Sequence, residues 1–261
     1  MTATPWLRRP LPRPYAKLRL VCLPHAGGST GLYRAWAQLF PPEVELLLVC
    51  PPGREDRLDE PIPPDLPELV SGLAAALAPV LDRPWAVFGH SMGAAVGHEL
   101  VARLPRLGRP APVHFFASAR EAPQHHRGGT VHLLDDDALC TELVRLGGTD
   151  PSLLAMPELR QLVLPAVRGD YRLIETYLAD GTRPAGPLTC PVTALIGTED
   201  TELDAKEADG WRDWTTGRFE LLSFPGGHFY LTDRPRAVVD AVLRRLPLRH
   251  GAPSRAGRWP A

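Results

Sequence analysis

A serine in a glycine-flanked turn is the feature of the sequence that most clearly suggests chemistry. It lies in Gly89-His90-Ser91-Met92-Gly93, after a strand-like apolar run at residues 85–88 and before a helical pattern of apolar residues that extends to Leu104. A serine at a sharp strand-to-helix turn forms a nucleophile elbow. Side chains at positions 89 and 93 would collide across such a turn, which explains the two glycines. The alternative interpretation is an ordinary glycine-rich turn capped by a serine.

A histidine near the end of the chain could supply the base that a serine nucleophile requires. His228 follows Pro225-Gly226-Gly227, directly after the expected last strand at residues 219–224. A lone histidine is more often structural. A glycine-flanked loop at the end of the sheet where ligands bind favours the catalytic interpretation, and we predict His228 as the general base.

The carboxylate that orients such a histidine has several candidates. In chains with a nucleophile elbow the acid lies between the serine and the histidine in sequence. The earlier expected strand, at residues 113–117, is followed by no carboxylate until Glu121. The next strand, at residues 191–197, is followed by four acidic residues: Glu199, Asp200, Glu202 and Asp204. We predict Asp200 as the acid, with Glu199 as the alternative.

A second glycine-containing loop could bind the negative charge that develops during attack by the serine. Pro24-His25-Ala26-Gly27-Gly28-Ser29 follows the first long expected strand, at residues 18–23. Adjacent glycines let the backbone approach a ligand closely. A loop at this place supplies one N–H to the oxyanion hole, and the residue after the nucleophile supplies the other. We therefore predict the backbone N–H groups of Ala26 and Met92 as the oxyanion hole; the alternative is a plain tight turn.

Expected strands alternate with expected helices along most of the chain. Strand-like apolar runs occupy residues 18–23, 45–50, 85–88, 113–117, 191–197 and 219–224. Alternation at this spacing predicts the α/β class, with a mainly parallel, doubly wound sheet. Ligands of such sheets bind at the carboxyl ends of the strands, where the candidate residues fall.

The alternation stops over residues 121–187, where amphipathic helical segments replace strands. We expect residues 15–120 and 188–249 to form the core, and residues 121–187 to form a helical lid over the carboxyl ends of the strands. The alternative is that these helices pack elsewhere on the sheet. The proline- and arginine-rich residues 1–14 and the C-terminal residues 250–261 are expected to be a flexible arm and a flexible tail.

Charge and hydropathy narrow the classes of function. The net charge is −1, with 29 Lys and Arg against 30 Asp and Glu, which gives no support to nucleic-acid binding through a broad basic face. No apolar run is long enough to span a membrane, and the N-terminal residues lack the hydrophobic stretch of a signal peptide. We therefore expect a cytoplasmic protein with no nucleic-acid or membrane partner.

The cysteines and clustered histidines give no metal-binding pattern. Cys22, Cys50, Cys140 and Cys190 form no Cys-x-x-Cys pair and are expected to be reduced thiols. His125, His126 and His132 have no cysteine or acidic residue at ligand spacing, so a solvated loop is expected there.

Taken together, the motifs give a specific family resemblance. They are Leu23-Pro24-His25-Ala26-Gly27-Gly28-Ser29, Pro52-Gly53-Arg54-Glu55, Gly89-His90-Ser91-Met92-Gly93-Ala94, Leu164-Pro165-Ala166-Val167-Arg168-Gly169-Asp170-Tyr171 and Pro225-Gly226-Gly227-His228-Phe229. Over residues 18–246 the chain resembles the free-standing type II thioesterases of polyketide and nonribosomal peptide assembly lines. It departs from them at residues 198–201, where the family usually shows Gly-Asp-x-Asp-Pro.

The resemblance implies an α/β-hydrolase fold and a serine thioesterase without metal or cofactor. The family's triad falls on Ser91, Asp200 and His228, and its oxyanion donors on Ala26 and Met92. Its substrates are stalled or wrongly primed acyl groups on the phosphopantetheine arm of acyl or peptidyl carrier proteins. We expect such a carrier protein as the partner and a monomeric enzyme.

Three other functions are compatible with the same fold. They are a general carboxylesterase or lipase, an acyltransferase, and a catalytically silent binding module; the intact serine, acid and histidine argue against the last. The acyl chain and the assembly line are not determined by the sequence. Because carrier proteins are acidic, we place the docking surface at the rim of the lid and at three arginines: Arg54, Arg57 and Arg120.

Overall fold

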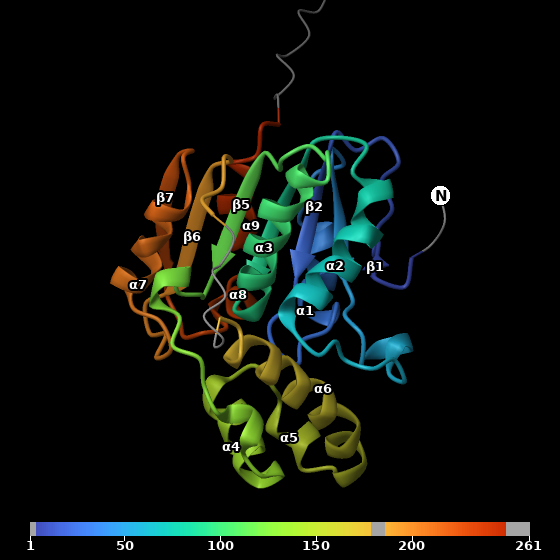
Figure 1. Ribbon diagram of the computed structural model, residues 1–261, viewed down its shortest axis with the longest axis vertical. Coiled ribbons are helices and arrows are strands. Elements are labelled where there is room, and N and C mark those ends of the chain that lie inside the picture. The colour runs from blue at the N-terminus through green and yellow to red at the C-terminus, as the bar shows by residue number, and fades with distance from the viewer. Residues whose placement is uncertain (1–3, 179–185, 249–261) are drawn as a thin grey trace, which may run out of the picture.

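A seven-stranded sheet forms the centre of the computed structural model, which describes residues 4–178 and 186–248 (Figure 1). The order across the sheet is β1-β3-β2-β4-β5-β6-β7, and all strands except β1 are parallel to their neighbours. The strands are β1 (Leu7–Arg8), β2 (Leu18–Leu23), β3 (Val44–Val49), β4 (Trp85–His90), β5 (His114–Ser118), β6 (Val192–Gly197) and β7 (Phe219–Phe224). The predicted mainly parallel, doubly wound sheet is confirmed.

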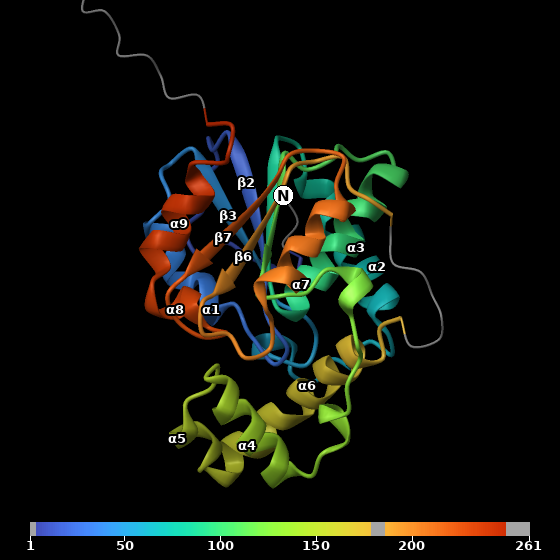
Figure 2. The ribbon, with the colours of Figure 1, turned by 90° about the vertical axis from the view of Figure 1, so that its left-hand side faces the viewer.

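Helices cover both faces of the sheet, which explains why strands β2 to β6 are completely buried and read as continuous apolar runs. Figure 2 shows α2 and α3 on one side and α1, α8 and α9 on the other. The α-helices of the described residues are α1 (Gly31–Arg34), α2 (Leu66–Leu77), α3 (Met92–Arg106), α4 (Asp136–Leu146), α5 (Pro151–Leu154), α6 (Pro157–Glu175), α7 (Ala205–Asp209), α8 (Tyr230–Asp233) and α9 (Pro235–Leu243).

Helices α4, α5 and α6 form a separate layer between β5 and β6 in sequence. In both ribbon views they lie beyond the ends of the strands, at the edge where Ser91 follows β4 (Figures 1 and 2). Their own apolar cluster is Leu139, Leu143, Leu154, Leu164 and Val167. The C-terminal half of α6 also packs into the main core through Leu173 and Ile174. The layer is therefore joined to the sheet by α6.

The N-terminal residues differ from the expected flexible arm. From residue 4 onward the chain is held against the sheet, because β1 pairs antiparallel with the open edge of β3. The guanidinium of Arg13 donates to the carbonyl oxygens of Ala37 and Val44, each at 2.7 Å. A two-residue strand has no periodicity that sequence analysis can detect, and its formation depends on the free edge of its partner. The expected tail at residues 250–261 lies outside the described residues.

The four cysteines are free thiols, and three of them are buried. Burial raises the pKa of Cys50 to about 11 and that of Cys190 to about 12, so both are protonated at neutral pH. None of the described helices has the length and apolar character needed to cross a membrane.

Buried histidines make the stability of the fold depend on pH. Burial lowers the pKa of His98 to about 4 and, with the nearby Arg245, that of His114 to about 4. In the unfolded chain each histidine has a pKa of about 6.5. The unfolded state therefore binds more protons, and the free energy of unfolding should fall as the pH drops from about 6.5 to about 4. At pH 5 each histidine should cost about 2 kcal/mol relative to pH 7.

Urea unfolding of the wild type and of His98→Phe at both pH values measures this effect. The His98 ring packs edge-on against Trp211 and Trp214, and phenylalanine supplies an aromatic ring that is uncharged at both pH values. The variant should lose about 2 kcal/mol less than the wild type between pH 7 and pH 5. An equal loss in the two proteins would contradict the assignment of His98 as a buried neutral group.

Candidate active site

Ser91 lies in a strained turn between β4 and α3. Its backbone has φ 54° and ψ −118°, and its N–H donates to the carbonyl of Ser118 at 2.8 Å. A Cβ atom at Gly89 would lie 2.1 Å from the carbonyl oxygen of Gly93, and one at Gly93 would lie 2.4 Å from that of Leu23. The backbone of the neighbouring turn and strand thus leaves no room for a side chain at either position. These observations describe a nucleophile elbow.

His228 and Asp200 are in contact between the loops that follow β6 and β7. The Nδ1 atom of His228 lies 2.9 Å from Oδ2 of Asp200, and the exposed fractions of their side chains are 10% and 0%. Asp200 follows β6 and His228 follows β7. The two loops approach closely, since a Cβ at Gly197 would lie 2.3 Å from the carbonyl oxygen of Gly227. The buried carboxylate can therefore orient the imidazole ring.

The other three acids of the cluster have different partners. Glu199 is exposed, and its contact with the histidine loop is made by its backbone N–H, which donates to the carbonyl of Gly226. Glu202 accepts from Arg145 at 2.7 Å. Asp204 caps α7 by accepting from the N–H of Glu207. Of the four, Asp200 is the acid whose carboxylate contacts His228.

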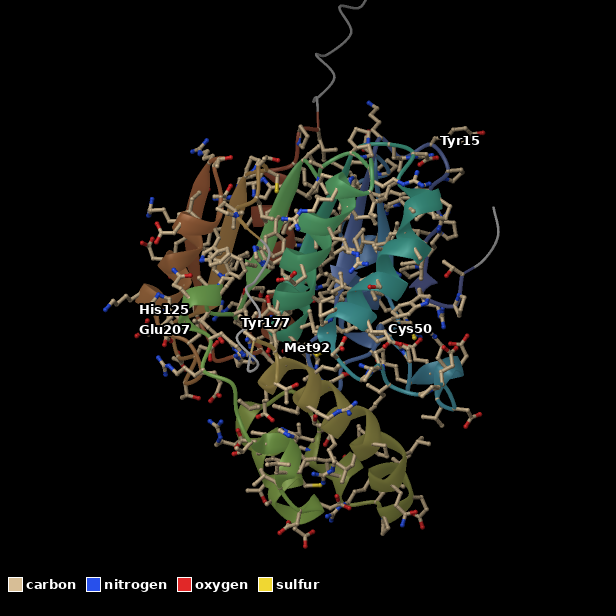
Figure 3. The ribbon with its side chains drawn as sticks, in the orientation of Figure 1. Tyr15, Cys50, Met92, His125, Tyr177 and Glu207 are labelled. Atoms are coloured by element: carbon tan, nitrogen blue, oxygen red, sulfur yellow. The ribbon has the colours of Figure 1, made fainter. Side chains whose placement is uncertain are left out.

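Ser91 and His228 line one cavity of about 600 Å³, together with Ala26 and Met92. Within the described residues, the backbone N–H groups of Ala26 and Met92 donate to no protein acceptor. Met92 lies where the lower end of α3 faces α6 (Figure 3). The far wall of the cavity comes from the helical layer, where Glu142 and Glu175 accompany five apolar residues: Leu143, Leu146, Val163, Val167 and Ile174. The cavity thus brings the Ser91 hydroxyl, the His228 ring and two N–H groups without a protein acceptor next to apolar side chains.

Across the described residues, no hydrogen bond joins Ser91 to His228. Catalytic hydrogen bonds of this kind often shorten only in the reacting complex.

Two further histidines surround His228, and sequence analysis gave them no role. The ring centroid of His90 lies 5.3 Å from that of His228 and 6.1 Å from that of His25. Burial, followed by the neighbouring His228, lowers the pKa of His25 to about 3 and that of His90 well below its usual value. Both rings are therefore neutral at neutral pH. Their only sequence signal was membership of the two glycine-containing motifs.

The arginines expected at the docking surface are engaged inside the protein. The exposed fractions of the Arg54 and Arg57 side chains are 6% and 3%. Arg54 pairs with Asp170, while Arg57 donates to the carbonyl of Cys50 at 2.7 Å. Arg120 is 13% exposed and lines the cavity. The expectation of a docking surface is therefore wrong for Arg54 and Arg57, because buried guanidinium groups cannot meet a partner.

One group of side chains in the described part of the chain has the spacing of metal ligands: Cys50, Glu55 and Asp56. The Cys50 thiol is protonated at neutral pH, as its raised pKa shows, and Arg8 pairs with both carboxylates. These partners fit an ion-pair cluster better than a cation site.

Comparisons with known proteins match nearly the whole chain. The thioesterase domain family matches residues 18–246. The chain is 42% identical to the probable cadicidin biosynthesis thioesterase of Streptomyces griseus over 253 residues, which are 97% of this chain and 69% of that protein. It is 41% identical to thioesterase PikA5 of Streptomyces venezuelae, over 95% of this chain and 88% of that protein. The solved structure of the type II thioesterase BorB from the borrelidin biosynthetic cluster superimposes with a TM-score of 0.85 at 40% identity, covering 94% of this chain and 99% of that one.

Proposed function

This chain belongs to the thioesterase family, and we propose that it is an editing enzyme that hydrolyses acyl groups from the phosphopantetheine arm of carrier proteins. Several of its relatives are named for cadicidin biosynthesis, for gramicidin S biosynthesis or as a type II thioesterase of an NRPS/PKS pathway, which supports stalled or wrongly primed acyl units of such an assembly line as substrates. The observation that carries the proposal is the cavity that Ser91 and His228 share, whose far wall includes apolar side chains of α4 and α6.

The proposed reaction begins with attack of the Ser91 Oγ on the thioester carbonyl carbon. Nε2 of His228 accepts the hydroxyl proton, while Asp200 accepts a hydrogen bond from Nδ1–H and so holds the tautomer that a base requires. The backbone N–H groups of Ala26 and Met92 donate to the carbonyl oxygen as it becomes an oxyanion. The carbon–sulfur bond then breaks, and His228 returns its proton to the pantetheine thiolate.

Hydrolysis of the acyl-enzyme completes the proposed cycle. His228 accepts a proton from a water molecule, whose oxygen attacks the ester carbonyl, and the same two N–H groups bind the second oxyanion. The carboxylic acid leaves as Ser91 regains its proton. The apolar wall of α4 and α6 provides a place for the acyl chain during both steps, and their position beyond the strand ends suits a lid.

A substrate comparison tests this function. Acyl groups of several chain lengths are each offered in three forms: on a holo-carrier protein, on free pantetheine and as an ethyl ester. Mass spectrometry should show free acid and holo-carrier, with kcat/KM for the carrier-bound thioester at least about tenfold above that for free pantetheine, equivalent to about 1.4 kcal/mol of docking energy.

Two outcomes would contradict the proposal and identify a different function. Cleavage of the ethyl ester with the carrier left loaded would identify a carboxylesterase. Transfer of the acyl group to an added alcohol or amine, in preference to water, would identify an acyltransferase.

A further inference from the structure

The loop that carries Ala26 is held in place by side chains from two distant segments. The N–H of Gly27 donates to Oδ2 of Asp170 at 2.8 Å, and the carbonyl of Gly28 accepts from Arg54 at 2.8 Å. Further along the loop, Oε1 of Glu55 accepts from both the N–H and the hydroxyl of Thr30, at 2.9 and 2.7 Å. The Gly27 N–H belongs to the peptide group that follows Ala26, so its bond fixes Ala26 from the carboxyl side.

Arg54 and Asp170 form a two-point ion pair inside the protein. The guanidinium donates to both carboxylate oxygens, at 2.7 and 2.9 Å, and the exposed fractions are 6% for Arg54 and 1% for Asp170. A buried ion pair is weak evidence for stability, because desolvation of the two charges offsets much of their attraction. Its planar, bidentate geometry is instead suited to fixing the position of whatever else the two groups bind. In this protein the two side chains also bind the backbone N–H of Gly27 and the backbone carbonyl of Gly28.

The same contact joins the helical layer to the loop. Asp170 is a residue of α6, and Val167, one turn earlier, lies against Gly27. A Cβ atom at Gly27 would lie 2.5 Å from Cγ2 of Val167, and the φ of Gly27 is +74°, so this position requires glycine. Val167 lines the cavity, whereas neither Arg54 nor Asp170 does. The ion pair therefore stands behind the loop, away from the place of the substrate.

We propose that Arg54 and Asp170 are positioning residues that hold the N–H of Ala26 in the geometry for binding the oxyanion. The inference rests on the proposed function, in which Ala26 supplies one of the two donors. It gives the Pro52-Gly53-Arg54-Glu55 segment and the Asp170 turn of α6 a common role. It also makes the C-terminal half of α6 a fixed wall of the cavity, since this half cannot leave the core without releasing Gly27.

The test compares two variants that each neutralise one carboxylate of a buried ion pair. Asp170→Asn breaks the pair behind the loop. Glu45→Gln breaks the pair of Glu45 with Arg19, which is joined at 2.8 Å, has exposed fractions of 1% and 1%, and lies near the amino ends of β2 and β3. Both variants should lose stability, because Asp170→Asn leaves the buried Arg54 without its charge partner and Glu45→Gln leaves the buried Arg19 with Asp82 alone.

The kinetic constants should separate the two variants. Asp170→Asn should lower kcat by about 10- to 100-fold with KM changed less than about threefold, because the misplaced donor acts in the transition state. Its affinity for an acyl trifluoromethyl ketone, whose adduct with the serine carries an oxyanion, should fall by a similar factor. Glu45→Gln should keep kcat within about twofold of the wild type when rates are normalised to folded protein.

Arg54→Lys provides a second variant that keeps the charge but loses the two-point geometry. It should lower kcat by about three- to tenfold, through the same misplacement of the loop. Equal kcat values for Asp170→Asn and Glu45→Gln, or an Arg54→Lys enzyme with wild-type kcat and wild-type affinity for the ketone, would overturn the inference. An inactive wild type would instead overturn the proposed function, so the two failures are distinguishable.

Discussion

The substitution Ser91→Ala is expected to lower kcat for thioester hydrolysis by about 10⁵- to 10⁶-fold, the scale of removing the nucleophile from a serine hydrolase triad. The Ser91 hydroxyl lies in the elbow and lines the same cavity as His228, so its removal leaves the base without a proton to accept. The proposed oxyanion donors and acyl chamber persist in the variant and account for the residual rate. Single-turnover mass spectrometry of an acyl-loaded carrier measures both the rate and the acyl-enzyme, which should be absent in Ser91→Ala.

The melting temperature of Ser91→Ala distinguishes a loss of catalysis from a loss of folding. Alanine at position 91 adopts the same φ of 54° with the same strain as serine, so the melting temperature should change little. Ser152→Ala is the control: this serine is exposed in α5 and bonds to Asp150, away from the elbow, and its variant should keep wild-type kcat. A Ser91→Ala enzyme with more than about a hundredth of the wild-type kcat would show that another group is the nucleophile.

The sheet and the positions of Ser91 and His228 were predictable because each depends on local sequence. Buried parallel strands read as apolar runs, and the elbow needs glycines at positions set by the collision of backbone atoms. The resemblance to the thioesterase family, which those motifs carried, is confirmed by the family match over residues 18–246. The fold class, and the edge of the sheet at which the candidate site lies, could therefore be predicted from short sequence motifs.

What the sequence did not predict depends on contacts between distant segments. Arg54 and Asp170 are separated by 116 residues, and without that partner a charged loop after a strand is expected to lie in solvent. The pairing of β1 depends in the same way on the free edge of β3. The choice between Glu199 and Asp200 had the same difficulty, because it depends on which carboxylate reaches the loop after β7.

Asparagine at position 200 is expected to lower kcat by about 10⁴-fold, as the corresponding change does in serine proteases. Oδ1 of Asp200 accepts from the N–H of Glu202 at 2.9 Å, and only the oxygen of an asparagine side chain can keep that bond. The amide nitrogen must then face Nδ1 of His228 as a donor. This places the imidazole proton on Nε2, where the base needs a lone pair, so Ser91 cannot be deprotonated.

The neighbouring carboxylate provides the matched comparison for Asp200→Asn. Glu199 is exposed, and its link to the histidine loop is a backbone bond that Glu199→Gln retains. This variant should therefore keep kcat within about threefold of the wild type, the scale of an exposed substitution that removes no catalytic contact. Steady-state kinetics of both variants decide between the two acids. A severe loss in Glu199→Gln with little change in Asp200→Asn would assign the acid to Glu199, and would require the loop after β6 to rearrange when substrate binds.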